Sequence, residues 1–167
     1  MSAQTIFESV SPIIHTTEEV SYLQDGIDSL LKSLYRVDTS SSLEKINEHL
    51  PHATAEKLID FMQKNNLDLK NTEEIRLLLS DLRDALESMK VVSLTLAFDP
   101  PQNTIDKLAN MIKDRFGPSY ILELSQCSGI LGGLVMVVHG KYIDLSLKKK
   151  LDILFGAKKQ EIATMIK

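Results

Sequence analysis

Apolar residues in the first ninety positions recur at the three- and four-residue spacing of amphipathic helices. This spacing predicts four helices, at residues 17–35, 43–50, 55–65 and 72–89. The last of them has the most continuous apolar stripe, formed by Ile75, Leu78, Leu79, Leu82, Ala85, Leu86 and Met89. Short polar stretches and prolines separate the segments and supply caps and stops. The first ninety residues are therefore predicted to form a helical bundle.

The period of the apolar pattern changes from about 3.6 to 2 residues at Lys90, which indicates a change from helix to strand. The elements expected after this point are strands at 91–98, 120–125, 131–138 and 142–144 and helices at 102–116 and 146–155. His139-Gly140-Lys141 is expected to form a hairpin-type turn between the last two strands. Gly156 is expected to interrupt the final helix.

The order of these elements predicts how the strands pair. A strand, helix, strand unit crosses over in the right-handed sense, so the first two strands should be parallel and the hairpin antiparallel to them. The run 131–138 is the most apolar and is predicted to be central, with the two helices packed on the sheet. The predicted fold is α+β, with a helical N-terminal domain at 1–90 and a mixed-sheet domain with flanking helices at 91–167.

Composition and charge exclude several classes of protein. The chain has 167 residues and a net charge of −4, with 9 basic and 16 acidic side chains up to residue 90 and 10 and 7 after it. No basic stripe is interleaved with aromatic residues, so nucleic acid is not an expected partner. No run of about 18 apolar residues could span a membrane. The single cysteine gives no argument for an oxidising compartment, so the cytoplasm is the default location. No secretory or organellar targeting signal is visible in the first fifteen residues.

No residue pattern predicts catalysis, a metal site or a cofactor site. Gly132 and Gly133 lack the spacing of a phosphate-binding loop and precede a strand, so a structural role is expected. Cys127 is the one cysteine and has no local sign of an activating base. Asp144 and Ser146 stand where the final helix begins, and helix capping accounts for both.

The second half contains an ordered set of features that together indicate a family. They are a strand, Pro100-Pro101 before an amphipathic helix, a second strand, Leu131-Gly132-Gly133 before an apolar strand, and Asp144-Leu145-Ser146 before a lysine-rich helix. This order resembles the C-terminal domain of the ATP synthase delta subunit, whose mitochondrial counterpart is the oligomycin-sensitivity-conferring protein. The resemblance covers about residues 90 to 156 and is closest to a bacterial form with a short N-terminal half.

The resemblance implies a mechanical function without bond chemistry. Such a subunit is part of the peripheral stalk, or stator, and holds the catalytic head against rotor torque during proton-driven ATP synthesis. The implied partners are subunit b and the alpha subunit of the head, and the implied location is the cytoplasmic face of the cell membrane, reached through the complex. The residues expected to contact the stalk are on the final helix: Leu147, Lys148, Leu151, Leu154 and Phe155.

Two other classes remain open at this stage. One is a small α/β binding or regulatory module unrelated to ATP synthase, with a helical half that forms a dimer. The other is a small enzyme that uses the Cys127 thiol. An amphipathic stripe has the same spacing whether it faces a core or a partner, so the spacing does not separate a core-facing side of a helix from a partner-binding side.

Overall fold

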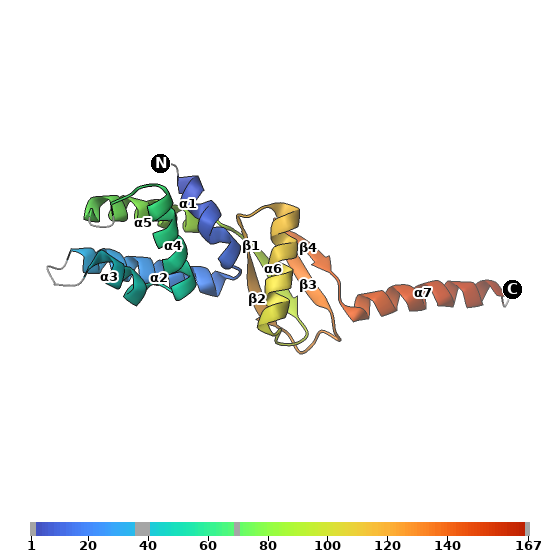
Figure 1. The fold of residues 1–167 in the computed structure, drawn as a ribbon. Coiled ribbons are helices and arrows are strands. Elements are labelled where there is room, and N and C mark those ends of the chain that lie inside the picture. Colours follow the sequence, from blue (N-terminus) through green and yellow to red (C-terminus); the bar gives the residue numbers. More distant parts are fainter. Residues whose placement is uncertain (1–2, 36–40, 69–70, 166–167) are drawn as a thin grey trace. The chain divides into compact units, whose positions relative to one another are not determined.

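The computed structural model describes residues 3–35, 41–68 and 71–165, with only the backbone at 3–5 and 157–165. The fold is α+β, as predicted, with helices before a small mixed sheet (Figure 1). Contacts divide the chain into two compact units. The helical unit comprises residues 1–90 and 109–121, and the sheet unit comprises residues 91–108 and 122–167.

The helical unit is built from amphipathic helices whose apolar faces form one core. Its helices are α1 (Ala3–Val10), α2 (Thr17–Leu34), α3 (Ser42–His49), α4 (His52–Lys64) and α5 (Thr72–Glu87), with a short 3-10 helix, η1 (Ser11–Ile13). Leu23, Ile27, Leu58, Leu79 and Leu82 are among the fully buried side chains. Gly26 lets α2 approach the end of α3, because a Cβ there would lie 2.5 Å from the carbonyl oxygen of His49.

Helix α1 is absent from the sequence-based prediction of four helices. Its side chains Ile6, Phe7 and Val10 are buried, and the helix packs against α4 and α5. A helix of eight residues is marginal by its own propensity, so this one depends on tertiary packing. Its three buried apolar residues form a pattern too short to distinguish a helix from a loop in the sequence.

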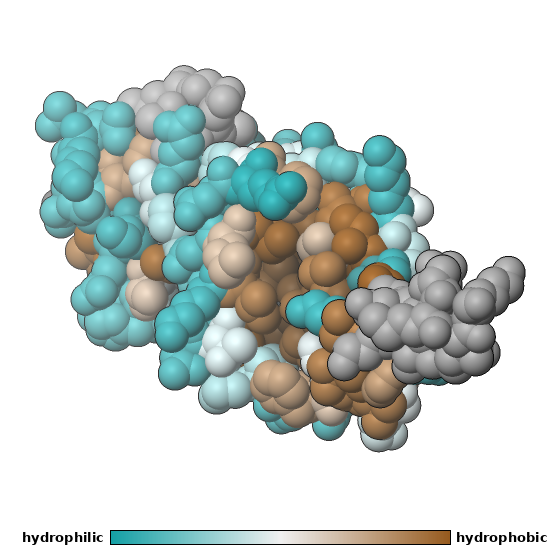
Figure 2. All heavy atoms as spheres, turned by 90° about the vertical axis from the view of Figure 1, so that its right-hand side faces the viewer, coloured by the Kyte–Doolittle hydropathy of each residue, from teal (hydrophilic) through white to brown (hydrophobic). Residues whose placement is uncertain are grey.

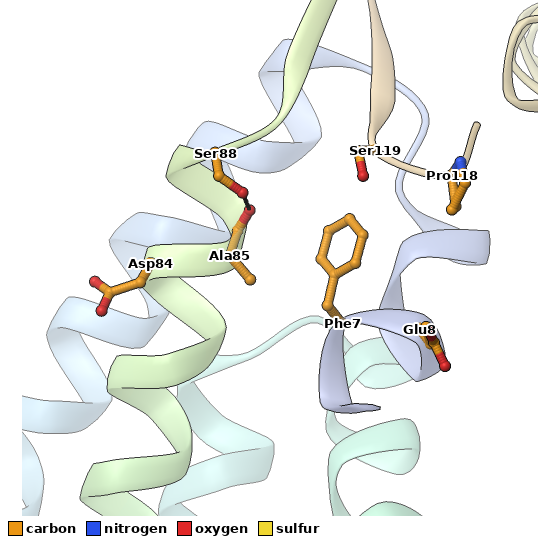
Figure 3. A pocket seen from close by; sticks show the side chains of 7 residues that line it. All are labelled: Phe7, Glu8, Asp84, Ala85, Ser88, Pro118 and Ser119. Carbon is orange, nitrogen blue, oxygen red and sulfur yellow. Dashed lines mark hydrogen bonds between the residues drawn. The ribbon is translucent and has the colours of Figure 1, made fainter. Parts of the chain in front are cut away.

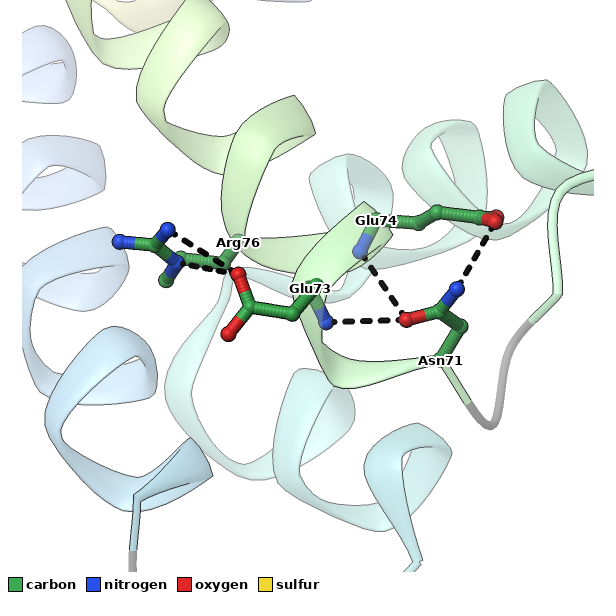
Figure 4. Close-up of polar contacts among 4 residues, drawn as sticks. All are labelled: Asn71, Glu73, Glu74 and Arg76. Atoms are coloured by element: carbon green, nitrogen blue, oxygen red, sulfur yellow. Dashed lines mark hydrogen bonds and ion pairs between the residues drawn. The ribbon is translucent and has the colours of Figure 1, made fainter.

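Side-chain caps fix the starts of three helices. Thr16 with Glu19 and Ser41 with Glu44 form capping boxes at α2 and α3. At α5, Asn71 Oδ1 accepts hydrogen bonds from the backbone N–H groups of Glu73 and Glu74, as Figure 4 shows. These caps satisfy N–H groups that would otherwise lack a partner within the helix.

The segment 109–121 is tied to the start of the chain by polar contacts. The Lys113 ammonium donates to the carbonyl oxygens of Ser11, at 2.6 Å, and Ile14, and the Ser11 hydroxyl donates to the carbonyl of Pro118 at 2.7 Å. Burial lowers the pKa of Lys113, and the charge of Glu19 opposes this shift. The helical unit thus includes residues about one hundred positions from its first helix.

The four strands are β1 (Lys90–Leu96), β2 (Tyr120–Gln126), β3 (Leu134–Val138) and β4 (Lys141–Asp144), in the order β2-β1-β3-β4. Side-chain hydrogen bonds join Ser93 to Glu123 and Thr95 to Ser125 at a constant offset, which identifies β1 and β2 as parallel. Helix α6 (Gln102–Phe116) connects these two strands. The pairs β1–β3 and β3–β4 are antiparallel, which confirms the predicted direction of β3 relative to the first two strands, while β4 runs in the same direction as β1.

Strand β3 is an inner strand, as predicted, but it begins at Leu134 and not at Leu131. Gly132 and Gly133 have φ values of +98° and +81°, so the backbone before Leu134 cannot continue an extended strand. The turn after β3 is a two-residue hairpin loop in which His139 and Gly140 both have positive φ.

The final helix, α7 (Leu147–Met165), runs through Gly156 without a break. The predicted interruption at Gly156 is therefore wrong. One helical glycine costs about 1 kcal/mol, which flanking residues with good helix propensity offset. No helix in the part of the chain that the structure describes is long and apolar enough to cross a membrane.

Candidate partner-binding surface

Gly132, Gly133, Asp144 and Ser146 lie together where α7 begins. The N–H of Leu147, the first residue of α7, donates to the carbonyl of Gly132 at 2.9 Å. The N–H of Leu145 donates to the carbonyl of Leu134, also at 2.9 Å. These bonds connect the loop before β3 and the first residue of β3 to the segment that leads from β4 into α7. The four positions form one structural joint, which sets the direction in which α7 leaves the sheet.

Gly133 is the most constrained glycine of this joint. A Cβ at this position would lie 2.5 Å from the carbonyl oxygen of Leu145 and 3.1 Å from the Cα of Ser146. Both neighbours are backbone atoms, which cannot rotate away as a side chain would. The positive φ adds a further penalty for any residue with a Cβ. Close approach of two backbone segments therefore requires glycine here.

Asp144 and Ser146 hold the first turn of α7. The Ser146 N–H donates to Asp144 Oδ1 at 2.8 Å, and the Ser146 hydroxyl oxygen accepts from the N–H of Lys149 at 3.3 Å. Hydrogen bonds from the side chain and backbone of Ser146 hold the pKa of Asp144 below its ordinary value, and the charges of Lys149 and Lys148 lower it further. The Ser146 hydroxyl is buried and is engaged with the helix backbone.

One face of the sheet is only partly covered. On β1, Val92, Leu94 and Leu96 are buried. The pairing places Leu134 beside Leu96, Met136 beside Leu94 and Ile143 beside Met136, so all share that face. Leu134 and Met136 are half-buried, and Ile143 is 39% exposed. Burial therefore decreases from β1 towards β4.

The apolar surface continues from this open part of the sheet onto the neighbouring loop and helix. Leu131 is 65% exposed, and Leu145 and Leu147 are exposed as well. We use the term apolar surface for Leu131, Ile143, Leu145 and Leu147. Figure 2 shows a broad apolar area, hollowed in its middle, on the face turned to the viewer. A group of neighbouring exposed apolar side chains, unlike a single one, is typical of a site that binds another molecule.

Helix α7 carries a second apolar feature, the α7 stripe, formed by Leu147, Leu151, Leu154 and Phe155. These residues follow the spacing i, i+4, i+7, i+8 and so share one side of the helix. Leu151 is half-buried, whereas Leu154 and Phe155 are 60% and 65% exposed. The prediction that residues 146–155 pack on the sheet is therefore wrong for Leu154 and Phe155. Their apolar side chains have no core to enter.

The helical unit has a shallow pocket between α1, α5 and the residues before β2 (Figure 3). The Phe7 ring points into it, while the carboxylates of Glu8 and Asp84 point away. The Ser88 hydroxyl donates to the carbonyl of Ala85. This pocket does not bring a nucleophile and a base together. Among the described residues, no three His, Cys, Asp or Glu side chains are grouped to hold a metal ion.

A comparison with protein-family models identifies the kind of protein to which these surfaces belong. The family model of the ATP synthase delta (OSCP) subunit matches residues 18–155, most of both units. The chain belongs to the ATP synthase delta (OSCP) subunit family. Members of the delta (OSCP) family are non-catalytic subunits of the ATP synthase peripheral stalk. A search of curated proteins finds no match to this chain.

The family match decides against a module unrelated to ATP synthase. It also extends beyond the motifs of the second half, because it begins within α2 of the helical unit. Several residues of the apolar surface were not predicted from sequence, namely Leu131, Ile143 and Leu145. Leu145 lies between Asp144, at the end of a strand, and Ser146, the helix cap. This position was the one sequence signal of its exposure. Leu131 was assigned to the strand interior, which concealed its exposure.

Proposed function

We propose that this delta-family subunit links the catalytic head to subunit b at the cytoplasmic face of the membrane, without inserting into the bilayer. In this proposal the N-terminal half, residues 1–90, contacts the alpha subunit of the head. The C-terminal domain, residues 91–167, binds the C-terminal helix of subunit b through Leu147, Lys148, Leu151, Leu154 and Phe155. The link resists rotor torque while protons drive ATP synthesis.

The observation that supports this proposal most strongly is the exposure of the α7 stripe. An isolated apolar side chain on a surface needs no explanation, but four at helical spacing on one side of α7 form a continuous strip. An amphipathic partner helix can cover such a strip. Covering Leu154 and Phe155 would contribute on the order of 1 to 2 kcal/mol each, by the apolar area removed from water.

The way in which α7 is anchored fits a role in transmitting force. Its first turn donates hydrogen bonds to the carbonyl of Gly132, in the loop before β3, and to the hydroxyl of Ser146, whose own N–H donates to Asp144 at the end of β4. A helix anchored in this way keeps its direction when a partner is attached to its side. A helix on a flexible linker would not transmit force to the sheet.

The test compares two aspartate substitutions on α7 that differ in the side of the helix they occupy. Leu154 lies in the stripe, and Ile153, which is 63% exposed, lies on the opposite side. The full chain and its variants are titrated with a peptide of the C-terminal segment of subunit b. We expect Leu154→Asp to weaken binding by about 30-fold or more, since a charge would be buried in an apolar contact.

The matched control, Ile153→Asp, is expected to change binding by less than about threefold, because surface substitutions away from a contact have small effects. Both variants should keep the helical circular dichroism of the parent chain. Equal losses in the two variants, or parent-like binding by Leu154→Asp, would contradict a role of the stripe in binding subunit b.

A further inference from the structure

Three lysines stand in the first turn of α7, and they take different positions around the apolar stripe. At about 100° per residue, Lys148 lies along one edge of the stripe and Lys150 along the other. Lys149 lies on the opposite side, near Ile153. All three side chains are exposed. The stripe therefore has a positive charge on each edge at its N-terminal end.

Both edge charges are available to a partner. In the part of the chain that the structure describes, no ion pair joins the ammonium groups of Lys148, Lys149 or Lys150 to a carboxylate. The Asp144 carboxylate accepts a hydrogen bond from the N–H of Ser146 and interacts electrostatically with Lys148 and Lys149. Lys150, at the other edge, is not among the charges that act on Asp144.

We infer that the helix bound by the α7 stripe carries acidic side chains along both edges of its own apolar stripe, and that Lys148 and Lys150 select it by charge. The inference rests on the proposed function, and it adds the chemistry of the partner. Opposite charges at the rim of an apolar contact steer the encounter and disfavour partners with the wrong sign. Because they stay near water, they affect the association rate more than the dissociation rate.

The same surface fits a second copy of this chain less well. In a parallel pair of helices, a second α7 stripe would bring its own Lys148 and Lys150 to the same end of the contact, so like charges would face each other. Like charges across an interface oppose association. The charge pattern thus favours an acidic helix over self-association.

A lipid surface is also a weaker candidate than a helix. Leu147, Leu145 and Ile143 are all exposed, and Figure 2 shows a broad apolar area that is hollowed in its middle. A helix in a groove fits a hollow of this kind. An interfacial membrane helix instead lays a single convex side against the bilayer. The shape therefore favours a protein helix.

The experiment uses two charge reversals of equal size on the full chain, Lys150→Glu at the edge and Lys149→Glu on the opposite side. Association rates with the subunit b peptide are measured by stopped flow at low and high salt. At about 20 mM salt we expect Lys150→Glu to lower the association rate by about 5- to 20-fold. The loss should shrink to less than about twofold at 0.5 M salt, where charges are screened within about 4 Å. Lys148→Glu should behave like Lys150→Glu.

The control Lys149→Glu should change the association rate by less than about twofold at either salt concentration. A peptide in which an edge carboxylate is replaced by lysine should bind Lys150→Glu faster than it binds the parent chain. Equal effects of Lys149→Glu and Lys150→Glu would overturn the inference, because net charge alone would then account for the rates.

Two further outcomes separate this inference from the proposed function. If Leu154→Asp abolishes peptide binding while both edge reversals leave the rates unchanged, the inference fails and the proposed function stands. If Leu154→Asp also has no effect, the proposed function fails. A third arm of the experiment uses vesicles with anionic lipid. If the parent chain binds these vesicles, and Lys150→Glu abolishes that binding but leaves peptide association unchanged, the lysines bind a membrane and the inference is overturned.

Discussion

Replacement of Gly133 by alanine should destabilise the sheet unit through one collision with the backbone. The added Cβ would lie 2.5 Å from the Leu145 carbonyl oxygen, a separation that Cβ atoms essentially never show. The positive φ costs about 1 to 2 kcal/mol. Displacement of packed backbone costs about 1 to 3 kcal/mol more. The free energy of unfolding should therefore fall by about 2 to 5 kcal/mol in Gly133→Ala.

Gly140 provides a matched control, because it has a φ of +72° but a Cβ at this position would meet nothing within 4 Å. Gly140→Ala should therefore show only the conformational penalty, about 1 to 2 kcal/mol. Both variants gain equally from a less flexible unfolded chain, so that contribution cancels in the difference. The difference between the variants measures the collision itself.

The assay is urea unfolding followed by circular dichroism, combined with hydrogen exchange at two amides of the joint. The N–H groups of Leu145 and Leu147 donate to Leu134 and Gly132, so they report opening of the joint directly. Exchange at both should accelerate in Gly133→Ala. If Gly133→Ala is no less stable than Gly140→Ala, the close approach at Gly133 has no energetic weight and the reasoning is refuted.

Two further predictions concern the start of α7. Ser146→Ala should lower the free energy of unfolding by about 0.5 to 2 kcal/mol, because the hydrogen bond that caps the N–H of Lys149 is lost. Ser146→Thr should keep most of this stability. An unchanged urea midpoint for Ser146→Ala would contradict the role of the cap. Because the pKa of Asp144 is lowered in the folded chain, its contribution to stability is fully present above the unfolded pKa of about 4 and is lost as the pH falls through the folded value. Asp144→Asn should therefore flatten the dependence of stability on pH below about pH 4, and an unaltered slope would count against this assignment.

The elements with long periodic patterns could be predicted from the sequence. The change of period at Lys90 gave the start of the sheet, and the α5 stripe gave the firmest helix of the first half. The hairpin-type turn predicted at His139-Gly140-Lys141 is present, with its two loop residues at His139 and Gly140. In these segments local propensity and tertiary structure agree.

The errors arose where tertiary packing or backbone conformation decides the outcome. Helix α1 is short and exists because Ile6 and Val10 enter a core formed mostly by later helices. Leu131 looked like part of an apolar strand, but the positive φ of Gly132 separates it from the strand. The exposure of Leu154 and Phe155 could not be predicted from spacing, since a stripe that faces a core and one that faces a partner have the same pattern.

The most direct test of the stator assignment is to purify the tagged full chain from its native membranes and identify the subunits that accompany it. At low salt, the chain should be recovered with subunit b and with the alpha subunit of the catalytic head. The Leu154→Asp variant should lose subunit b, while Ile153→Asp should retain it. Recovery of the parent chain with no ATP synthase subunit would contradict the proposed function.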